Sequence, residues 1–127
     1  MTKIIIHTDS APAAAGPYSQ AIVINGMVFC AGQVGLNPTT RTLVEGGIEG
    51  QAHQALSNIQ AVLLAAGATM NQVVKTTVFL ADINHFAAMN AVYATFFTSE
   101  PPARSTIQVA RLPLDALIEV ECIAVLD

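Results

Sequence analysis

LIEVECIAVL, residues 117–126, has the pattern of a strand and decides the fold class. Successive side chains of a strand point to opposite faces of its sheet, so the even-numbered residues, from Ile118 to Leu126, form one wholly apolar face. The odd-numbered residues place Glu119 and Glu121 on the opposite face, between apolar neighbours. The pattern predicts a sheet with helices packed on one face and with water or another subunit on the other.

Turn residues and periodicity predict the remaining strands and two helices. Asn25-Gly26 joins two strands as a two-residue turn, since both central residues of a type I′ turn need positive φ. Apolar residues at three- and four-residue steps predict an amphipathic helix over 48–66. A second amphipathic stretch predicts a helix that is capped by Asp82 or Asn84 and ends near Thr98. The other expected strands are 4–7, 18–24, 27–31, 73–80 and 104–110.

Two helices are too few to cover both faces of such a sheet, so both are predicted to lie on one face of an α+β two-layer sandwich. At 127 residues, the chain is predicted to form one domain, residues 1–127. Only 11% of the residues are charged, which is sparse for the surface of a soluble monomer. The face without helices is therefore predicted to pack against copies of the same chain.

Composition argues against several classes of function. The chain has 5 Lys and Arg against 9 Asp and Glu, and its dispersed cations argue against nucleic-acid binding. No apolar run approaches the ~18 residues of a membrane-spanning helix, and residues 1–8 are too short for a signal peptide. Cys30 and Cys122 lie in strand-like segments and are expected to be reduced, buried thiols of a cytoplasmic protein. The scattered histidines predict no metal site.

Three polar residues, Glu119, Arg104 and Asn90, are candidates for a functional site. In a strand of unknown function a carboxylate more often is solvated and keeps a sheet face soluble. The apolar neighbours of Glu119 also suit a second role, that of a partly desolvated base that orients water. Arg104 either pairs with a helix end or with Glu119, or it holds a substrate carboxylate with its guanidinium. Asn90 lies between Phe86 and Tyr93 in an apolar helix stripe, so its amide must bond either backbone or a ligand.

Tyr18 and Gly32 flank the predicted hairpin. A tyrosine at the start of a strand offers an aromatic wall with a hydroxyl tip, and glycine permits close approach of the backbone, although each is most often a turn residue. No Ser/His/Asp arrangement, phosphate-binding glycine loop or nucleotide fingerprint occurs in the sequence. The residues alone predict a small, acidic, oligomeric α+β protein with an Arg/Glu/Tyr/Asn cleft for a small anion.

Several motifs occur together over practically the whole chain. They are Gly16-Pro17-Tyr18-Ser19-Gln20-Ala21, Ala31-Gly32-Gln33, Asn37-Pro38, Pro102-Ala103-Arg104-Ser105, Val109-Ala110-Arg111-Leu112-Pro113 and Ile118-Glu119-Val120-Glu121. The set resembles the RidA/YjgF family of reactive intermediate deaminases, and the Pro-Ala-Arg-Ser and Val-Ala-Arg-Leu-Pro segments are its most specific part. Arg104 matters most, because that arginine marks the deaminase-active branch of the family.

The resemblance implies a chorismate-mutase-like α+β sandwich with a mixed sheet. It implies a homotrimer whose sheets surround a central barrel, with ligand clefts between subunits. The implied activity is that of a 2-iminobutanoate/2-iminopropanoate deaminase, a hydrolase of reactive enamine and imine intermediates that releases 2-keto acids and ammonia. Neither a metal nor a cofactor is implied, and the expected partners are small 2-imino and 2-keto acids, not nucleic acid or a membrane.

Matching motifs also imply roles for single residues. Arg104 would hold the substrate carboxylate, and Glu119 would orient or activate the attacking water together with the backbone around Thr106. The pocket would be completed by Tyr18, Gly32 and Asn90. Two positions depart from the common pattern: Ala31 stands where many relatives have serine, and Thr106 stands where many have cysteine.

Two other classes of function compete with the imine hydrolase. The same cleft would suit a keto-acid-binding or chaperone-like module without turnover. RNA cleavage is attributed to some relatives, but the acidic balance and the dispersed cations of this chain argue against it.

Overall fold

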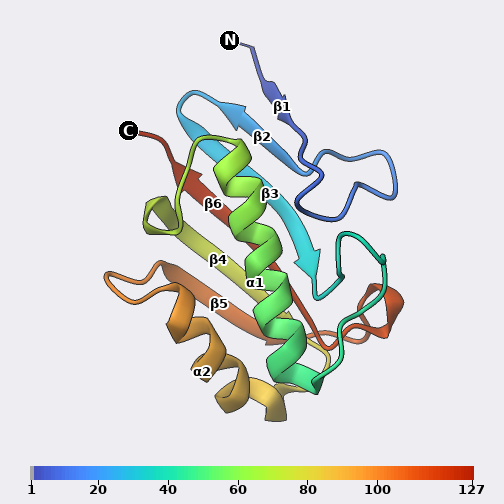
Figure 1. Ribbon diagram of the computed structural model, residues 1–127. Coiled ribbons are helices and arrows are strands. Elements are labelled where there is room, and N and C mark those ends of the chain that lie inside the picture. Colours follow the sequence, from blue (N-terminus) through green and yellow to red (C-terminus); the bar gives the residue numbers. More distant parts are fainter. Residues whose placement is uncertain (1) are drawn as a thin grey trace.

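Six strands form one mixed sheet in the computed structural model, which describes residues 2–127 (Figure 1). The strands are β1 (Ile4–Ile6), β2 (Ala21–Ile24), β3 (Met27–Val34), β4 (Val73–Leu80), β5 (Ala103–Gln108) and β6 (Ile118–Val125). Their order across the sheet is β1-β2-β3-β6-β4-β5. β4 and β5 run parallel, while the other neighbouring strands are antiparallel. The strand at the C-terminal end of the sequence therefore lies inside the sheet.

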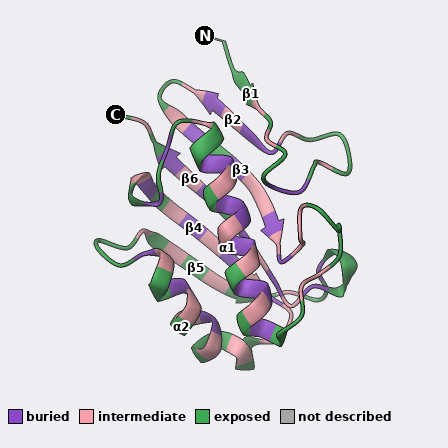
Figure 2. Ribbon diagram, in the orientation of Figure 1, coloured by how far each residue is buried: buried purple, intermediate pink, exposed green. Residues whose placement is uncertain are grey.

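Two helices, α1 (Gly47–Ala65) and α2 (Phe86–Phe96), lie side by side over one face of this sheet (Figure 1). The even-numbered residues of β6, from Ile118 to Ala124, are buried beneath them (Figure 2). α1 adds fully buried side chains such as Leu56 and Leu63 to the same core. The predicted α+β two-layer sandwich, with both helices on one face, is confirmed.

The β2–β3 hairpin forms at the predicted turn, where Asn25 and Gly26 have φ of 51° and 73°. β3 is longer than predicted and contains a bulge. Cys30 is opposite Cys122 of β6, whereas Gln33 is opposite Val120, so β3 carries one extra residue between these pairs. Ala31-Gly32 lies in this bulge, which a two-residue alternation cannot represent.

The second helix begins later than predicted. Asp82 forms the predicted cap, since its Oδ1 accepts a hydrogen bond of 2.9 Å from the Asn84 backbone N–H. A 3-10 turn at Ile83–His85 then precedes α2. β5 is shorter than the predicted 104–110, because its last residue, Gln108, pairs with the end of β4.

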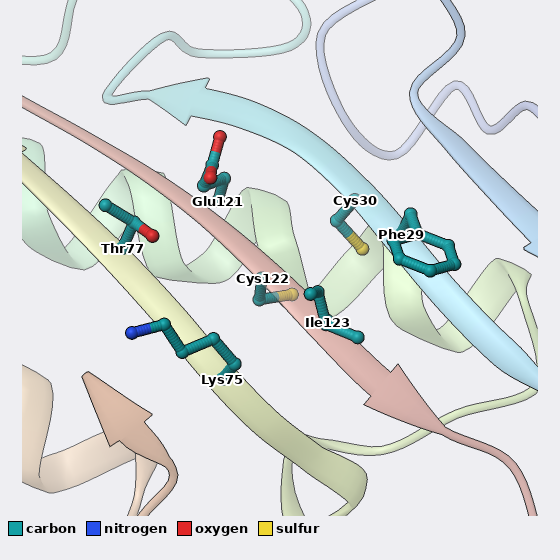
Figure 3. A pocket seen from close by; sticks show the side chains of 7 residues that line it. All are labelled: Phe29, Cys30, Lys75, Thr77, Glu121, Cys122 and Ile123. Carbon is teal, nitrogen blue, oxygen red and sulfur yellow. The ribbon is translucent and has the colours of Figure 1, made fainter. Parts of the chain in front are cut away.

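The other sheet face, called the open face below, carries no helix (Figure 1). Large apolar side chains are exposed on it, including Phe29, Ile107 and Val125. A hollow of about 400 Å³ runs over β3, β6 and β4, with Phe29, Lys75 and Glu121 among its lining residues (Figure 3). No helix within residues 2–127 is long and apolar enough to cross a membrane.

Candidate functional site

Glu119 lies on the open face of β6, against the backbone of Gly32 in β3. A β-carbon at position 32 would lie 2.8 Å from Glu119 Cδ and 3.1 Å from its Oε2, so only glycine leaves room for the carboxylate there. Glu119 is half-buried, and burial, followed by the negative charge of Glu121, raises its pKa. The group is therefore a stronger base than an exposed glutamate.

Tyr18, Gly32 and Glu119 line one cavity of about 260 Å³, called the Glu119 cavity below. Its other walls are mainly apolar and come from the loop after β1, the end of β3 and the turn at Pro113-Leu114. The Tyr18 Oη accepts a hydrogen bond of 3.2 Å from the backbone of this loop. The cavity thus combines one carboxylate and one phenol with an apolar surround.

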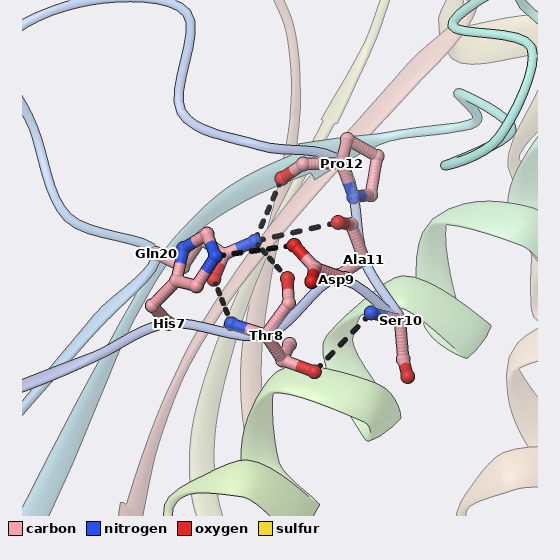
Figure 4. Close-up of polar contacts among 7 residues, drawn as sticks. All are labelled: His7, Thr8, Asp9, Ser10, Ala11, Pro12 and Gln20. Atoms are coloured by element: carbon pink, nitrogen blue, oxygen red, sulfur yellow. Dashed lines mark hydrogen bonds and ion pairs between the residues drawn. The ribbon is translucent and has the colours of Figure 1, made fainter.

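Gln20 fixes the loop that forms one wall of this cavity (Figure 4). Its Nε2 donates to the backbone oxygens of Thr8 at 3.0 Å, Ala11 at 3.4 Å and Pro12 at 2.8 Å. Its Oε1 accepts from the Thr8 N–H at 2.7 Å. Gln20 is only 2% exposed, so one buried amide holds residues 8–12 against the sheet.

Arg104 lies on the opposite face of the sheet from Glu119. Register partners form one row across β3, β6, β4 and β5, which reads Cys30, Cys122, Thr76, Arg104. Residues in one such row share a sheet face, and Cys122 and Thr76 are buried under the helices. The Arg104 guanidinium carbon accordingly lies over α2, 4.7 Å from the ring centroid of Tyr93 and 5.4 Å from that of Phe86.

Two buried oxygens on the same two elements have no hydrogen-bond partner within residues 2–127: Asn90 Oδ1 and Thr106 Oγ1. Asn90 lies between Phe86 and Tyr93 along α2, and Thr106 follows Arg104 by two residues in β5. The hydrogen bond from a backbone N–H, one of the two partners predicted for the Asn90 amide, is thus not made to its oxygen within residues 2–127. The same residues also offer Arg104 no ion pair.

The predicted site residues therefore form two groups in one chain. Tyr18, Gly32 and Glu119 share the Glu119 cavity, whereas Arg104, Asn90 and Thr106 form a second group, the Arg104 cluster, at the edge made by α2 and β5. The two groups lie on opposite sheet faces, and the residues that line the Glu119 cavity within 2–127 include none of the Arg104 cluster. Within residues 2–127 the cluster holds one cation without an ion pair and two buried oxygens without a hydrogen-bond partner. The guanidinium and the Thr106 hydroxyl can donate to a carboxylate, whereas the Asn90 amide oxygen can only accept.

Sequence reasoning did not assign a role to Gln20, Phe86 or Tyr93. In the sequence Gln20 is only one residue of a family motif, and its neighbours do not predict the four hydrogen bonds that its side chain makes with the backbone. The aromatic residues were interpreted as core of the second helix. The one signal in the sequence was Asn90, a polar residue on the same apolar stripe, which indicates that this helix face also contacts polar groups.

The family model described as endoribonuclease L-PSP matches residues 8–126. A RutC family protein of Synechocystis is 55% identical over 128 residues, which cover 99% of this chain and 98% of that protein. The 2-iminobutanoate/2-iminopropanoate deaminase of Mus musculus is 50% identical over 121 residues, which cover 95% of this chain and 90% of that protein.

Solved structures share the whole architecture. A protein of the conserved Rid family from Yersinia pestis superposes with a TM-score of 0.96 and 49% identity, covering 98% of this chain and 100% of that one. The TdcF protein of E. coli, solved with bound serine, gives a TM-score of 0.93 and 42% identity, covering 98% of this chain and 99% of that one. The fold is therefore shared in full with solved proteins of known family.

Proposed function

The chain belongs to the Rid family, whose family model is described as endoribonuclease L-PSP, and from this premise we propose that it hydrolyses 2-iminobutanoate and 2-iminopropanoate to 2-keto acids and ammonia. The deaminase name of the mouse relative supports this reaction. One observation carries the proposal: the Arg104 guanidinium has no carboxylate partner within residues 2–127. Its fork of N–H donors suits a substrate carboxylate, a group that the serine bound to the E. coli relative also has.

Hydrolysis then needs positioning and a base, because a protonated imine is already electrophilic at carbon. Arg104 holds the substrate carboxylate, and Asn90 and the backbone around Thr106 bound the site. Glu119 takes a proton from water as the water oxygen bonds to the C=N carbon, and the π electrons move to nitrogen. Glu119 returns the proton to the nitrogen of the resulting carbinolamine. It then takes the hydroxyl proton as the C=O bond forms and the C–N bond breaks, which releases ammonia, and it finally gives this proton to solvent.

The raised pKa of Glu119 supports this double role. A carboxylate that is desolvated accepts a proton from water more readily, and the protonated form is stable enough to deliver it to the leaving nitrogen. Tyr18 and Gly32 bound the same cavity, so they would shape the space in which the water and the substrate meet.

A shared cleft requires more than one chain, since Glu119 and Arg104 lie on opposite sheet faces. We therefore propose a homotrimer in which the open face of each sheet packs against its neighbours. The exposed Phe29, Ile107 and Val125 support this assembly, because such side chains are stabilised by exclusion from water. Each cleft would combine the Glu119 cavity of one protomer with the Arg104 cluster of the next. The free, buried thiols of Cys30 and Cys122 support a cytoplasmic location.

The family description names a different reaction, the cleavage of RNA. The net charge of −4 argues against it, because RNA binding depends on clustered cations that neutralise phosphates. A keto-acid-binding module without turnover remains the alternative that shares every contact described above, and it differs only in the outcome of the assay below.

The deciding experiment follows the release of 2-ketobutyrate by threonine dehydratase while semicarbazide traps the free imine. Addition of the protein should speed 2-ketobutyrate release and lower the amount of trapped adduct. Arg104→Gln should abolish this effect, whereas Arg41→Gln, which removes an exposed guanidinium elsewhere, should not. Unchanged release and trapping with the wild-type protein would overturn the hydrolase and favour a binding module.

A further inference from the structure

The Arg104 side chain is held by aromatic rings instead of by a carboxylate. Its guanidinium carbon lies 4.7 Å from the Tyr93 centroid and 5.4 Å from the Phe86 centroid. Within residues 2–127 no acidic side chain lies within ion-pair distance of it. Attraction to a ring face stabilises a cation without an acidic partner, and the N–H groups of a guanidinium point outward in its plane.

Tyr93 is itself fixed on its other sides. Its hydroxyl and that of Thr76 share a buried hydrogen bond of 2.7 Å. The centroid of its ring lies 4.6 Å from the ring centroid of Phe97. Thr76 is also the register partner of Arg104 in the parallel β4–β5 pair. A closed path therefore runs from Arg104 through the Tyr93 ring to Thr76 and back across one strand pair. Tyr93 is 5% exposed and Thr76 is fully buried, so the part of this path beyond Arg104 lies within the core.

We propose that Tyr93 is a positioning residue for Arg104, with Phe86 as the second wall, and that together they hold the guanidinium plane ready for a carboxylate. Neither ring needs to touch the reacting atoms. The inference rests on the proposed function, since it assumes that Arg104 receives the carboxylate of the substrate. An acidic partner in their place would have fixed the arginine equally well, but it would have occupied the same N–H groups.

The test separates the ring from the hydroxyl. Tyr93→Phe keeps the ring and removes the bond to Thr76, so it should lower the melting temperature while the affinity for 2-ketobutyrate, measured by calorimetry, stays close to that of the wild type. Tyr93→Leu removes the ring and should weaken that affinity about fivefold, the size of one partly desolvated cation–π contact. KM should rise by a similar factor, with a smaller change in kcat.

Phe97→Leu is the matched control, because Phe97 packs on Tyr93 but is not in ring contact with Arg104. It should lower stability without changing affinity. Phe86→Leu provides a second test at a partly exposed position, where folding is least at risk, and should weaken affinity about threefold. Folded Tyr93→Leu and Phe86→Leu proteins that bind 2-ketobutyrate as tightly as the wild type would overturn the proposal.

Failure of the proposed function has a different signature, namely a wild-type protein that neither binds 2-ketobutyrate nor speeds its release. The contact between Arg104 and Tyr93 remains testable in that case by NMR of the ligand-free protein. The Arg104 Hδ protons should resonate upfield because of the ring current, and Tyr93→Leu should move them downfield. Unchanged shifts would overturn the proposed positioning regardless of the reaction.

Discussion

The carboxylate of Glu119 occupies the space that a side chain at Gly32 would fill, since a β-carbon there would lie 2.8 Å from Glu119 Cδ. Gly32 lies in the bulge of β3, two residues before Val34, which is the register partner of Glu119. The position of the Glu119 carboxylate thus depends on the absence of a side chain at Gly32 of the neighbouring strand.

Gly32→Ala should lower kcat about tenfold or more, because displacement of a reacting group by about 1 Å is costly in rate. The melting temperature should change little, since the atoms met by the new methyl group belong to the flexible end of Glu119. Gly26→Ala is the control: its φ of 73° makes alanine unfavourable, but open space surrounds the site, so stability should fall and turnover should not. Wild-type kcat in Gly32→Ala would contradict the role of this contact.

Glu119→Gln should separate stability from catalysis. The raised pKa means that the folded protein disfavours the charged form, so the unfolding free energy falls as pH rises through the pKa of Glu119. At pH 7 the variant should therefore be as stable as the wild type or more stable, and the difference should disappear in acid below the ordinary carboxyl range. Turnover should fall about 100-fold. Thermal unfolding at two pH values and the trapping assay check both results.

The pH dependence of turnover should report the same carboxylate. The acidic limb of the kcat/KM profile should lie above the ordinary glutamate range, because the base is protonated below its raised pKa. Glu121→Gln removes the second cause of that shift and should move the limb slightly to lower pH, whereas the exposed Glu49→Gln should not. If Glu121→Gln leaves the pH of the acidic limb unchanged, that limb reports the titration of a group other than Glu119.

Gln20→Leu should destabilise the protein by about 2 kcal/mol, because it leaves backbone groups of Thr8 and Pro12 without their partner. The released loop forms one wall of the Glu119 cavity, so KM should also rise. Gln60→Leu, at an exposed position of α1, should change neither quantity. Denaturant unfolding and steady-state kinetics provide the comparison, and an unchanged KM would separate the loop from the cavity.

Phe29→Asp should convert the proposed homotrimer into monomers and abolish turnover at the same time. A charge on the open face opposes association, and dissociation would separate the two halves of each cleft. Leu64→Asp places the same charge on an exposed residue of α1 and should leave both assembly and turnover intact. Light scattering measures the mass, and a wild-type monomer with full activity would contradict the shared cleft.

The sequence predicts the layers of the fold because its strongest signals are periodic. Alternation in β6 identifies the covered face, and Asn25-Gly26 identifies the hairpin. Periodicity does not reveal the bulge at Ala31-Gly32, because a single extra residue breaks the two-residue repeat from which strands are recognised.

Most candidate site residues were predicted from chemistry and Thr106 from the family motif, but their division between two sheet faces of one chain was not predicted. Arg104 and Glu119 both lie in strands whose side chains alternate between the two sheet faces. Only the register of β4 with β5 and with β6 assigns them to opposite faces. The aromatic support of Arg104 was hidden for a related reason. Phe86 and Tyr93 fit an apolar helix stripe, and which strand residue meets that stripe depends on long-range pairing.

The place of β6 between β3 and β4 has a consequence for biosynthesis. β1, β2 and β3 leave the ribosome first, and β4 and β5 follow, yet these two sets share no strand pairing until β6 arrives. The nascent chain must therefore carry two unjoined sheet fragments with open edges from the synthesis of β5 until β6 is available. Such edges attract other strands, so this period is when the polypeptide is most exposed to mispairing and most in need of chaperones.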